Sequence, residues 1–291
     1  MDWFPLTLIC AFLLASADAL TKARLADYSL RELTFVRLTL AGLVISPLVL
    51  TQPIPDLPPS FWAWLGASVP LEILATFLYM FAIRDHSLAA TLPYLAFTPV
   101  FVLLTGYLLL GETLSGRGVT GILLVVTGAW LLNFNVIKIR RLGGILEPFL
   151  MVFRNRGSLA MLGAALLYGI TSVTTKGAMQ FMPPVLFGPF YMLVVGLLLL
   201  PLLGLASPRA LSGVWRKPWA VLAVSGLTGL MLIAHFTAIT QIEVAYMISV
   251  KRTSLLFGIL YGALIFRESG LGRHLLAGGV MVAGVLVIAW T

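Results

Sequence analysis

An internal repeat in a strongly apolar sequence is the feature that most constrains this chain. The motif Glu-x-x-x-Gly-Arg occupies residues 112–117 and again residues 268–273, 156 positions later. Further matches share this offset or one of 154: Ala82-Ile83 with Ala238-Ile239, Gly106 with Gly262, Gly128 with Gly284, Thr21-Lys22 with Thr175-Lys176, Gly42 with Gly196, and Pro47 with Pro201. One two-residue slip therefore aligns residues 1–135 with residues 158–291. Internal repeats in an apolar chain are typical of secondary transporters, whose binding site lies at the repeat interface.

Composition and run lengths indicate an integral membrane protein, because 60% of the residues are apolar and only 10% are charged. A helix that crosses a bilayer needs about 20 apolar residues. Ten runs near this length follow one another: residues 3–21, 33–51, 61–83, 87–110, 117–135, 158–181, 185–206, 218–240, 243–265 and 272–290. An odd number of spans per repeat inverts the second half relative to the first. The sequence therefore predicts an all-α integral membrane fold of ten transmembrane helices, built as two inverted five-helix repeats at 1–135 and 158–291 that a basic linker loop at 136–157 joins.

Several function classes lack their sequence signals here. Only residues 136–157 form a sizeable loop, which leaves no room for a soluble catalytic domain. No Walker loop, HExxH, GxSxG or clustered His/Cys set occurs, so neither a cofactor nor a metal nor enzymatic activity is predicted. Cys10 is the single cysteine, which excludes an intramolecular disulfide. The alternatives to a transporter are an enzyme that acts on lipid-linked phosphates and a non-transporting or lipid-scrambling membrane protein.

The N-terminal segment has one feature of a secretory signal peptide. Ala15-Ser16-Ala17 has the small-residue pattern of a cleavage site. The leader Met1-Asp2-Trp3, however, carries no basic side chain, and cleavage would leave the sixth span without its repeat partner. The segment is therefore predicted to be a retained transmembrane helix.

Basic residues are concentrated beside the loops after odd-numbered spans, and this bias predicts the orientation of the chain in the membrane. Arg117 alone stands beside a loop after an even-numbered span. Arg37 lies just inside the second span, and its long side chain is expected to extend back to the membrane surface that holds the loops after odd-numbered spans. Thirteen basic residues lie in or beside the loops after odd-numbered spans: Arg24, Arg31, Arg84, Lys138, Arg140, Arg141, Arg154, Arg156, Arg209, Arg216, Lys217, Arg267 and Arg273. The positive-inside rule places these loops in the cytoplasm and both termini outside. The net charge of +8 thus reflects topology, and no nucleic-acid partner is predicted.

The motifs resemble those of EamA-type transporters of the drug/metabolite transporter superfamily. The marks of the resemblance are Gly111-Glu112, Arg267-Glu268, Lys22, Lys176, Pro93 and Pro99. The resemblance covers nearly the whole chain. It implies a multi-pass protein of the cell inner (plasma) membrane that exports a small-molecule metabolite such as an amino acid, while eukaryotic relatives carry nucleotide sugars or sugar phosphates. It also implies a midplane cavity lined by spans one, three, four, six, eight and nine. Family members usually have cytoplasmic termini, and the charge bias of this chain favours the reverse.

Lys251-Arg252 in the ninth span resembles the Lys-Arg pair of the triose-phosphate translocators. Those relatives carry a lysine in the fourth span where this chain has Leu95, which argues against a phosphorylated substrate. Lys251 lies eight residues beyond Glu243, about 12 Å along the helix, and Arg252 points about 100° away from it. An intramembrane charge costs roughly 2.5–3.5 kcal/mol, so such residues face a cavity or a partner. The pair is predicted either to bind an anionic or zwitterionic substrate group or to pair internally with an acid.

Glu72 is the candidate acid of the cavity, since it sits mid-span in the third run, two residues after Pro70. It is expected either to bind and release a proton during transport or to form a permanent ion pair or backbone hydrogen bond. Asp18 and Lys22 are four residues apart, which predicts a local ion pair. Lys176 repeats Lys22 but has Ser172 in place of that acid, which makes Lys176 the better cavity candidate.

The polar aromatic residues give weaker signals. His235 in the eighth span aligns with Tyr79 in the third and is either a titrating cavity group or a histidine with a satisfied hydrogen bond. Most tyrosines and tryptophans lie near span ends, where they suit the interfacial aromatic belt. Tyr94 and Tyr168 lie deeper and are predicted to contact substrate.

Spans five and ten carry residues that predict packing. Glu112 and Glu268 open these spans, where a carboxylate caps exposed amides and complements the helix dipole. Glycines at 116, 118, 121, 128, 272, 278, 279 and 284 fall near the small-residue spacing that permits close helix contact. The two spans are therefore predicted to be packing elements, and they are candidates for a homodimer face within the membrane lipid.

Overall fold

The computed structural model describes residues 2–86, 88–131, 155–206, 213–265 and 271–290, and throughout them regular structure is helical. In the first half the helices are α1 (Trp3–Arg24), α2 (Leu30–Phe35), α3 (Ala41–Ile45), α4 (Pro59–Asp85), α5 (Leu88–Leu95), α6 (Thr98–Leu110) and α7 (Gly116–Leu131). In the second half they are α9 (Arg156–Ala178), α10 (Pro184–Ala206), α12 (Pro218–Ile239), α13 (Val244–Lys251), α14 (Ser254–Ile265) and α15 (Leu271–Ala289). The all-helical class is confirmed.

Six segments of the described chain are long and apolar enough to cross a membrane: Trp3–Arg24, Leu30–Thr51, Pro59–Asp85, Arg156–Ala178, Pro184–Pro201 and Pro218–Ile239. Three shorter apolar helices accompany them, namely Thr98–Leu110, Gly116–Leu131 and Leu276–Ala289. Each of these helices overlaps one of the predicted apolar runs, and several extend one to three residues beyond it. A multi-pass membrane protein follows, and the ten-span layout stays a prediction.

The fourth and ninth predicted spans are each broken in the middle. α5 ends at Leu95 and α6 begins at Thr98, while α13 ends at Lys251 and α14 begins at Ser254. The two breaks are 156 positions apart and so occupy equivalent places in the two repeats. Pro99 lies in the first turn of α6, where its missing N–H costs nothing. The predicted spans 87–110 and 243–265 therefore each consist of two short helices, an arrangement that is stable in a membrane where the break is buried in protein or lines a cavity.

The second span is irregular at a different place. Between α2 and α3 the chain forms a π-helical turn, η1 (Val36–Leu40), and after α3 a 3-10 turn, η2 (Ser46–Thr51), with Pro47 in its first turn. A π-helical turn is wider than an α-helical turn, and such turns occur often at functional sites. Here the turn carries Arg37, which is only 5% exposed. The expectation that Arg37 extends to the membrane surface was wrong.

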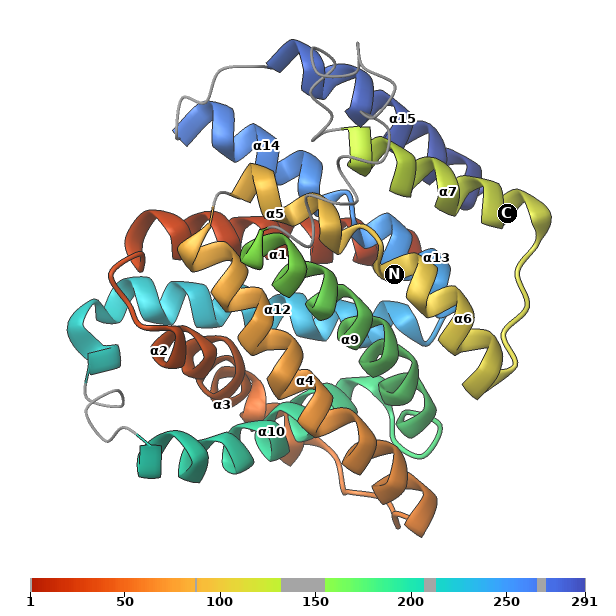
Figure 1. Cartoon of the computed structure of the whole chain (residues 1–291). Coiled ribbons are helices and arrows are strands. Elements are labelled where there is room, and N and C mark those ends of the chain that lie inside the picture. Colours follow the sequence, from red (N-terminus) through yellow and green to blue (C-terminus); the bar gives the residue numbers. More distant parts are fainter. Residues whose placement is uncertain (1, 87, 132–154, 207–212, 266–270, 291) are drawn as a thin grey trace.

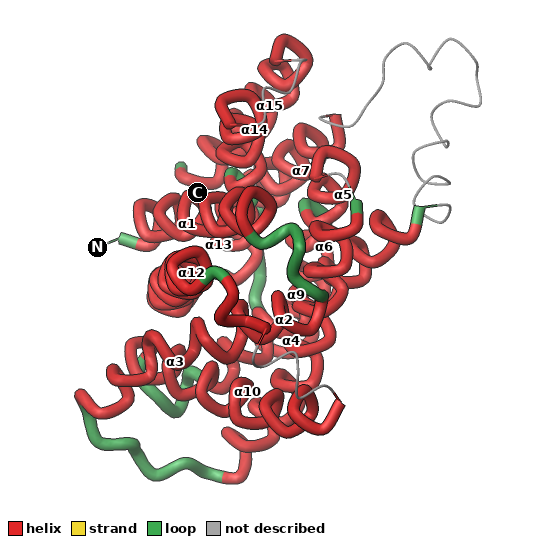
Figure 2. Tube along the Cα trace, turned by 90° about the vertical axis from the view of Figure 1, so that its left-hand side faces the viewer, coloured by secondary structure: helices red, strands yellow, loops and turns green. Residues whose placement is uncertain are grey.

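The long helices pack in pairs that join the two halves. α1 packs on α12, and α4 packs on α9. In the repeat, α1 corresponds to α9 and α4 corresponds to α12. Each contact therefore joins the first span of one half to the third span of the other half, so the two contacts are equivalent. Both views place α7 and α15 together at one end of the molecule, α3 and α10 at the other, and α1, α4, α9 and α12 between them (Figures 1 and 2). An in-plane two-fold axis between the halves stays a prediction that this exchange of partners supports.

Glycines bring α7 and α15 into direct backbone contact. A Cβ on Gly121 would come within 2.9 Å of the Gly284 carbonyl oxygen, and a Cβ on Gly284 within 2.6 Å of the Gly121 carbonyl oxygen. Only glycine fits both positions, so spans five and ten are packing elements within one chain. Gly121, Gly128 and Gly284 are thereby used inside the protein, and any homodimer has to form through other residues.

Candidate functional site

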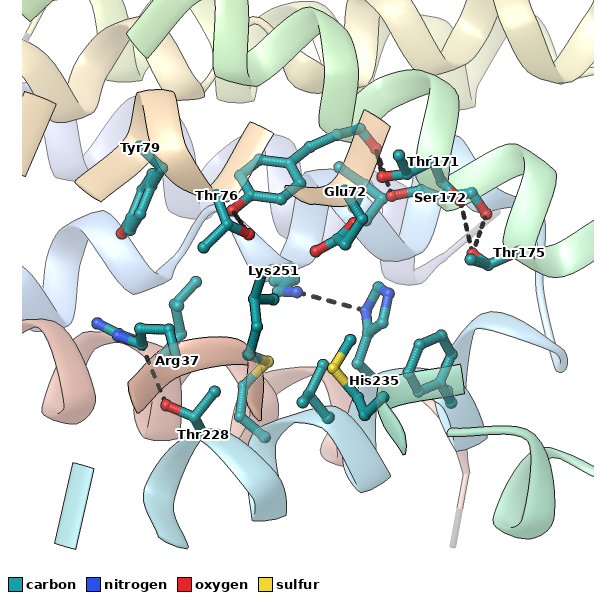
Figure 3. A pocket seen from close by; sticks show the side chains of 18 of the residues that line it. Arg37, Glu72, Thr76, Tyr79, Thr171, Ser172, Thr175, Thr228, His235 and Lys251 are labelled. Atoms are coloured by element: carbon teal, nitrogen blue, oxygen red, sulfur yellow. Dashed lines mark hydrogen bonds between the residues drawn. The ribbon is translucent and has the colours of Figure 1, made fainter. Parts of the chain in front are cut away.

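A cavity of about 110 Å³ lies between the two repeats. Its wall comes from α1, η1, α4, α5, α9, α10, α12 and α13. Side chains with polar groups make up much of it: Arg37, Glu72, Thr76, Tyr79, Tyr168, Thr171, Ser172, Thr175, Tyr191, Thr228, His235, Lys251 and Arg252. Figure 3 shows Glu72, Thr76 and Tyr79 on one wall, with Lys251, His235 and Arg37 facing them. The wall includes the six spans that the family resemblance implies, together with the second and seventh spans.

Lys251 and Arg252 lie at the break between α13 and α14. Lys251 is the last residue of α13 and Arg252 is its C-cap, so both cations adjoin the negative end of that helix dipole. The Lys251 Nζ lies 3.4 Å from His235 Nδ1 (Figure 3), and Cys10 of α1 lies beside it. Arg252 is 3% exposed, and its Nε has no hydrogen-bond partner. Among the described residues, no carboxylate forms an ion pair with either of them.

Glu72 projects from α4 into the same cavity, two residues after Pro70. Thr171 on α9 lies beside this carboxyl group, and its hydroxyl donates to the Tyr168 carbonyl oxygen at 3.4 Å. Glu72 and Lys251 point toward each other across the cavity (Figure 3), and they form no ion pair in this structure. An acid and a base therefore face the same space, each able to interact with a molecule between them.

A buried ion-pair network forms the neighbouring wall. The Arg37 guanidinium donates a hydrogen bond to Asp18, and the Tyr79 hydroxyl donates to the other oxygen of the same carboxylate. Arg37 Nη1 also donates to Thr228 Oγ1 at 3.3 Å, while its Nε has no partner. The predicted pair between Asp18 and Lys22 does not form. Because Asp18 is only 6% exposed, it takes a buried cation from another span in preference to a lysine at the helix end.

Lys22 and Lys176 lie instead at the ends of their helices and bind the turns before the broken spans. Lys22 Nζ donates to the carbonyl oxygens of Ile83 and His86, at 2.9 and 3.1 Å. Lys176 Nζ donates to the Ile242 carbonyl oxygen at 2.7 Å, and Ile242 is the repeat equivalent of His86. Lys176 also forms an ion pair of 2.7 Å with Glu112. The expectation that Lys176 lines the cavity was wrong, because an acid distant in sequence neutralises it.

Glu112 caps a different helix from the one expected. Its Oε2 accepts a hydrogen bond of 3.0 Å from the backbone N–H of Val244, the first residue of α13. Gly111 allows this placement, since it ends α6 in the left-handed conformation at φ = 67°. Glu112 therefore links α6, α9 and α13 across the repeat boundary. Glu268 lies outside the described residues.

The aromatic candidates divide between cavity and periphery. Tyr168 lines the cavity and shares a 3.0 Å hydrogen bond with Thr76 (Figure 3). His235 also lines it and is 7% exposed. Tyr94 is not part of the wall and hydrogen-bonds to Ser158 instead.

Sequence reasoning missed Arg37, Tyr79 and Tyr191 as cavity residues. Tyr191 is 1% exposed, stacks on Phe187, and its hydroxyl has no hydrogen-bond partner. The repeat itself held the signal, because Tyr191 stands 154 positions after Arg37 and His235 stands 156 after Tyr79. Applying the offset to every polar residue in a span would have found all three.

Comparison with known proteins agrees with this geometry. A model described as the EamA-like transporter family matches residues 2–134 and again residues 155–290. A protein of known crystal structure shares the fold with a TM-score of 0.71 over 98% of each chain at 18% identity, which shows likeness of fold alone. A search of curated proteins found no match. The two matched segments cover nearly all of the sequence, and the chain belongs to the EamA-like transporter family, a family of membrane proteins that are generally transporters.

Proposed function

We propose that this protein is a secondary transporter that moves a small anionic or zwitterionic metabolite through the cavity by alternating access, in the inner membrane. The observation that carries the proposal is the charge of the wall. Asp18 and Arg37 neutralise each other, which leaves Lys251 and Arg252 against Glu72, the one acid among the described residues of the wall. The empty cavity therefore has an excess of one positive charge, which a bound anion can balance.

The low polarity around these groups strengthens their attraction for an anion. At an effective dielectric constant of about 20, two unit charges 4 Å apart attract by about 4 kcal/mol, which is comparable to the cost of inserting one charge into a membrane. Arg252 offers the planar fork that suits a carboxylate, whereas Lys251 acts as a point charge. A substrate carboxylate bound between them and an ammonium group near Glu72 would use both signs of charge.

Glu72 also supplies a route for coupling to protons. A carboxyl group that faces Lys251 without pairing to it is free to exchange a proton as the substrate arrives and leaves. In this scheme the Glu72 carboxylate and the substrate anion compete for the same positive charge, and a proton bound by Glu72 frees that charge for the substrate. Proton coupling then depends on Glu72, so Glu72→Gln should change the pH dependence of transport more than it changes substrate affinity.

The test begins with a thermal-shift screen of carboxylates, amino acids and phosphate esters on the purified protein, followed by counterflow in proteoliposomes with each compound that stabilises it. Arg252→Ala and Lys251→Ala should each abolish the stabilisation and the counterflow, while the proteins elute as folded. Arg117→Ala, an exposed arginine in the first turn of α7, is the matched control and should behave as the parent protein.

Two results would contradict the proposal. Unchanged binding in both basic variants would leave Lys251 and Arg252 a purely structural role. Binding without counterflow in any reconstituted condition would favour a non-transporting membrane protein.

A further inference from the structure

We infer that the outer surface formed by α4, α6 and α9 is a binding site for one anionic glycerophospholipid. A second hollow of about 510 Å³ lies there, away from the central cavity. Its wall is Leu78 of α4, Phe101 of α6, and Arg156, Leu159, Ala160, Leu162, Gly163 and Leu166 of α9. Among the described residues that line this groove, Arg156 is the one that carries a charge, and the others are apolar.

The groove has the length of one membrane leaflet. Arg156 and Leu166 are ten residues apart on α9, which corresponds to about 15 Å along the helix. The hydrocarbon core of a bilayer is about 30 Å thick, so one leaflet spans about half of that. Arg156 is the first residue of α9, a membrane-spanning segment, and therefore stands at the level of the lipid headgroups. A chain that lies in the groove with its headgroup at Arg156 would fit one leaflet.

Small residues make the floor of the groove and apolar residues its rims. Ala160 is buried, and Gly163 has no side chain, with the Leu78 Cδ1 lying 3.2 Å from where its Cβ would be. Leu159 and Leu166 are 45% and 41% exposed on the same helix face. Because the surrounding solvent in a bilayer is hydrocarbon, an acyl chain is the occupant whose chemistry matches this surface.

The positive charge of Arg156, at one end of the groove, determines which lipid headgroup fits there. Arg156 is exposed and has no acidic partner among the described residues. Gly157 lies against His86, so the end of α4 adjoins the start of α9, and there Arg84 is already paired with Asp85 at 2.8 Å. The positive end of the α9 dipole adds to the same field. An anionic phosphodiester headgroup complements this unpaired charge.

The experiment counts lipids bound to the whole protein by native mass spectrometry, during titration with phosphatidylglycerol and with phosphatidylcholine of identical chains. The parent protein should bind the first phosphatidylglycerol more tightly than phosphatidylcholine. Arg156→Gln should weaken the binding of phosphatidylglycerol about fivefold, as expected for one basic residue near a membrane surface, and leave phosphatidylcholine unchanged. Arg117→Gln, the exposed arginine of α7, is the matched control and should keep the preference.

Variants of the groove itself separate chain binding from headgroup binding. Gly163→Leu places a side chain where the acyl chain would lie and should weaken both lipids alike, and Leu166→Ala, at an exposed position, should do so to a smaller extent. Equal binding of the two lipids by the parent protein, or an unchanged preference in Arg156→Gln, would overturn the inference. Displacement of phosphatidylglycerol by equimolar inorganic phosphate would also overturn it, since the site would then hold a free anion. These readouts require no transport substrate.

Discussion

The two halves of the chain supply equivalent positions to the cavity and fill them with different chemistry. In the first half the positions hold Asp18, Arg37 and Tyr79, which form one buried ion-pair network. The repeat equivalents in the second half are Ser172, Tyr191 and His235, all uncharged or weakly basic. At these positions the first half pairs its two charged groups with each other, whereas in the second half the Tyr191 hydroxyl has no partner.

The remaining charges of the cavity follow the same asymmetry. Lys251 and Arg252 stand where the first half has Leu95 and Ala96. Glu72 stands where the second half has Thr228. Duplication gives two equal backbones, and the substrate site arises from the positions at which their side chains differ. Stability should therefore depend most on the self-paired network of the first half, and binding on Lys251, Arg252 and Tyr191 of the second half together with Glu72 of the first.

The largest expected effect is on stability, at Arg37. Arg37→Met leaves Asp18 buried without its cation, and breaking a buried pair costs about 3–5 kcal/mol. The loss should appear as a lower unfolding temperature in detergent. The double variant Asp18→Asn with Arg37→Met should recover most of it, because no unpaired charge remains. If the double variant is as unstable as the single one, the network contributes through packing and the comparison fails.

The second effect concerns Glu112, which pairs with Lys176 at the end of α9 and caps α13. Glu112→Ala removes both the partner of Lys176 and the cap of α13, so it should destabilise the protein by about 1–2 kcal/mol, the upper range for a lost helix cap. Unfolding temperature measures the loss, with Arg117→Ala as the control in the adjacent helix. Because α13 carries Lys251 and Arg252, the same variant should weaken the binding of any ligand from the thermal-shift screen. A fully stable variant would contradict the cross-repeat role of Glu112.

The third effect is on binding alone. Tyr191→Phe removes a buried hydroxyl that has no partner in the protein, so the unfolding temperature should stay equal or rise. If the substrate supplies the missing partner, affinity should fall about fivefold, which corresponds to one hydrogen bond of about 1 kcal/mol. Thermal shift gives the stability, and ligand titration gives the affinity. Lower stability with unchanged affinity would reverse the roles assigned to the two halves.

The sequence predicted the scaffold better than the contacts. The ten apolar runs and the repeat offset located the helices because apolar length and periodicity are local properties of a chain. The same properties placed Lys251, Arg252, Glu72, Tyr168 and His235 inside spans, and the structure brings these five to one cavity. They failed for Lys176 and Asp18, because their partners are distant in sequence: Glu112 lies in the loop between α6 and α7, and Arg37 lies in η1. Local spacing favours the neighbour four residues away, whereas a buried charge takes whichever partner the packing brings closest.

The smallest effect lies outside the membrane, in the loops that follow the first and sixth spans. Asp27 bonds to Lys217 at 2.6 Å, while its repeat equivalent is the apolar Phe181. The hydrogen bond from Lys217 holds the pKa of Asp27 below its ordinary value. A lowered pKa stabilises the folded protein above the ordinary value of about 4, and that contribution is lost as the pH falls through the folded pKa. Asp27→Asn should therefore lower the unfolding temperature slightly at pH 7, less so at high salt, and by a smaller amount as the pH falls below about 4. A difference of equal size at pH 7 and at the lower pH would mean that Asp27 acts through loop geometry and not through its charge.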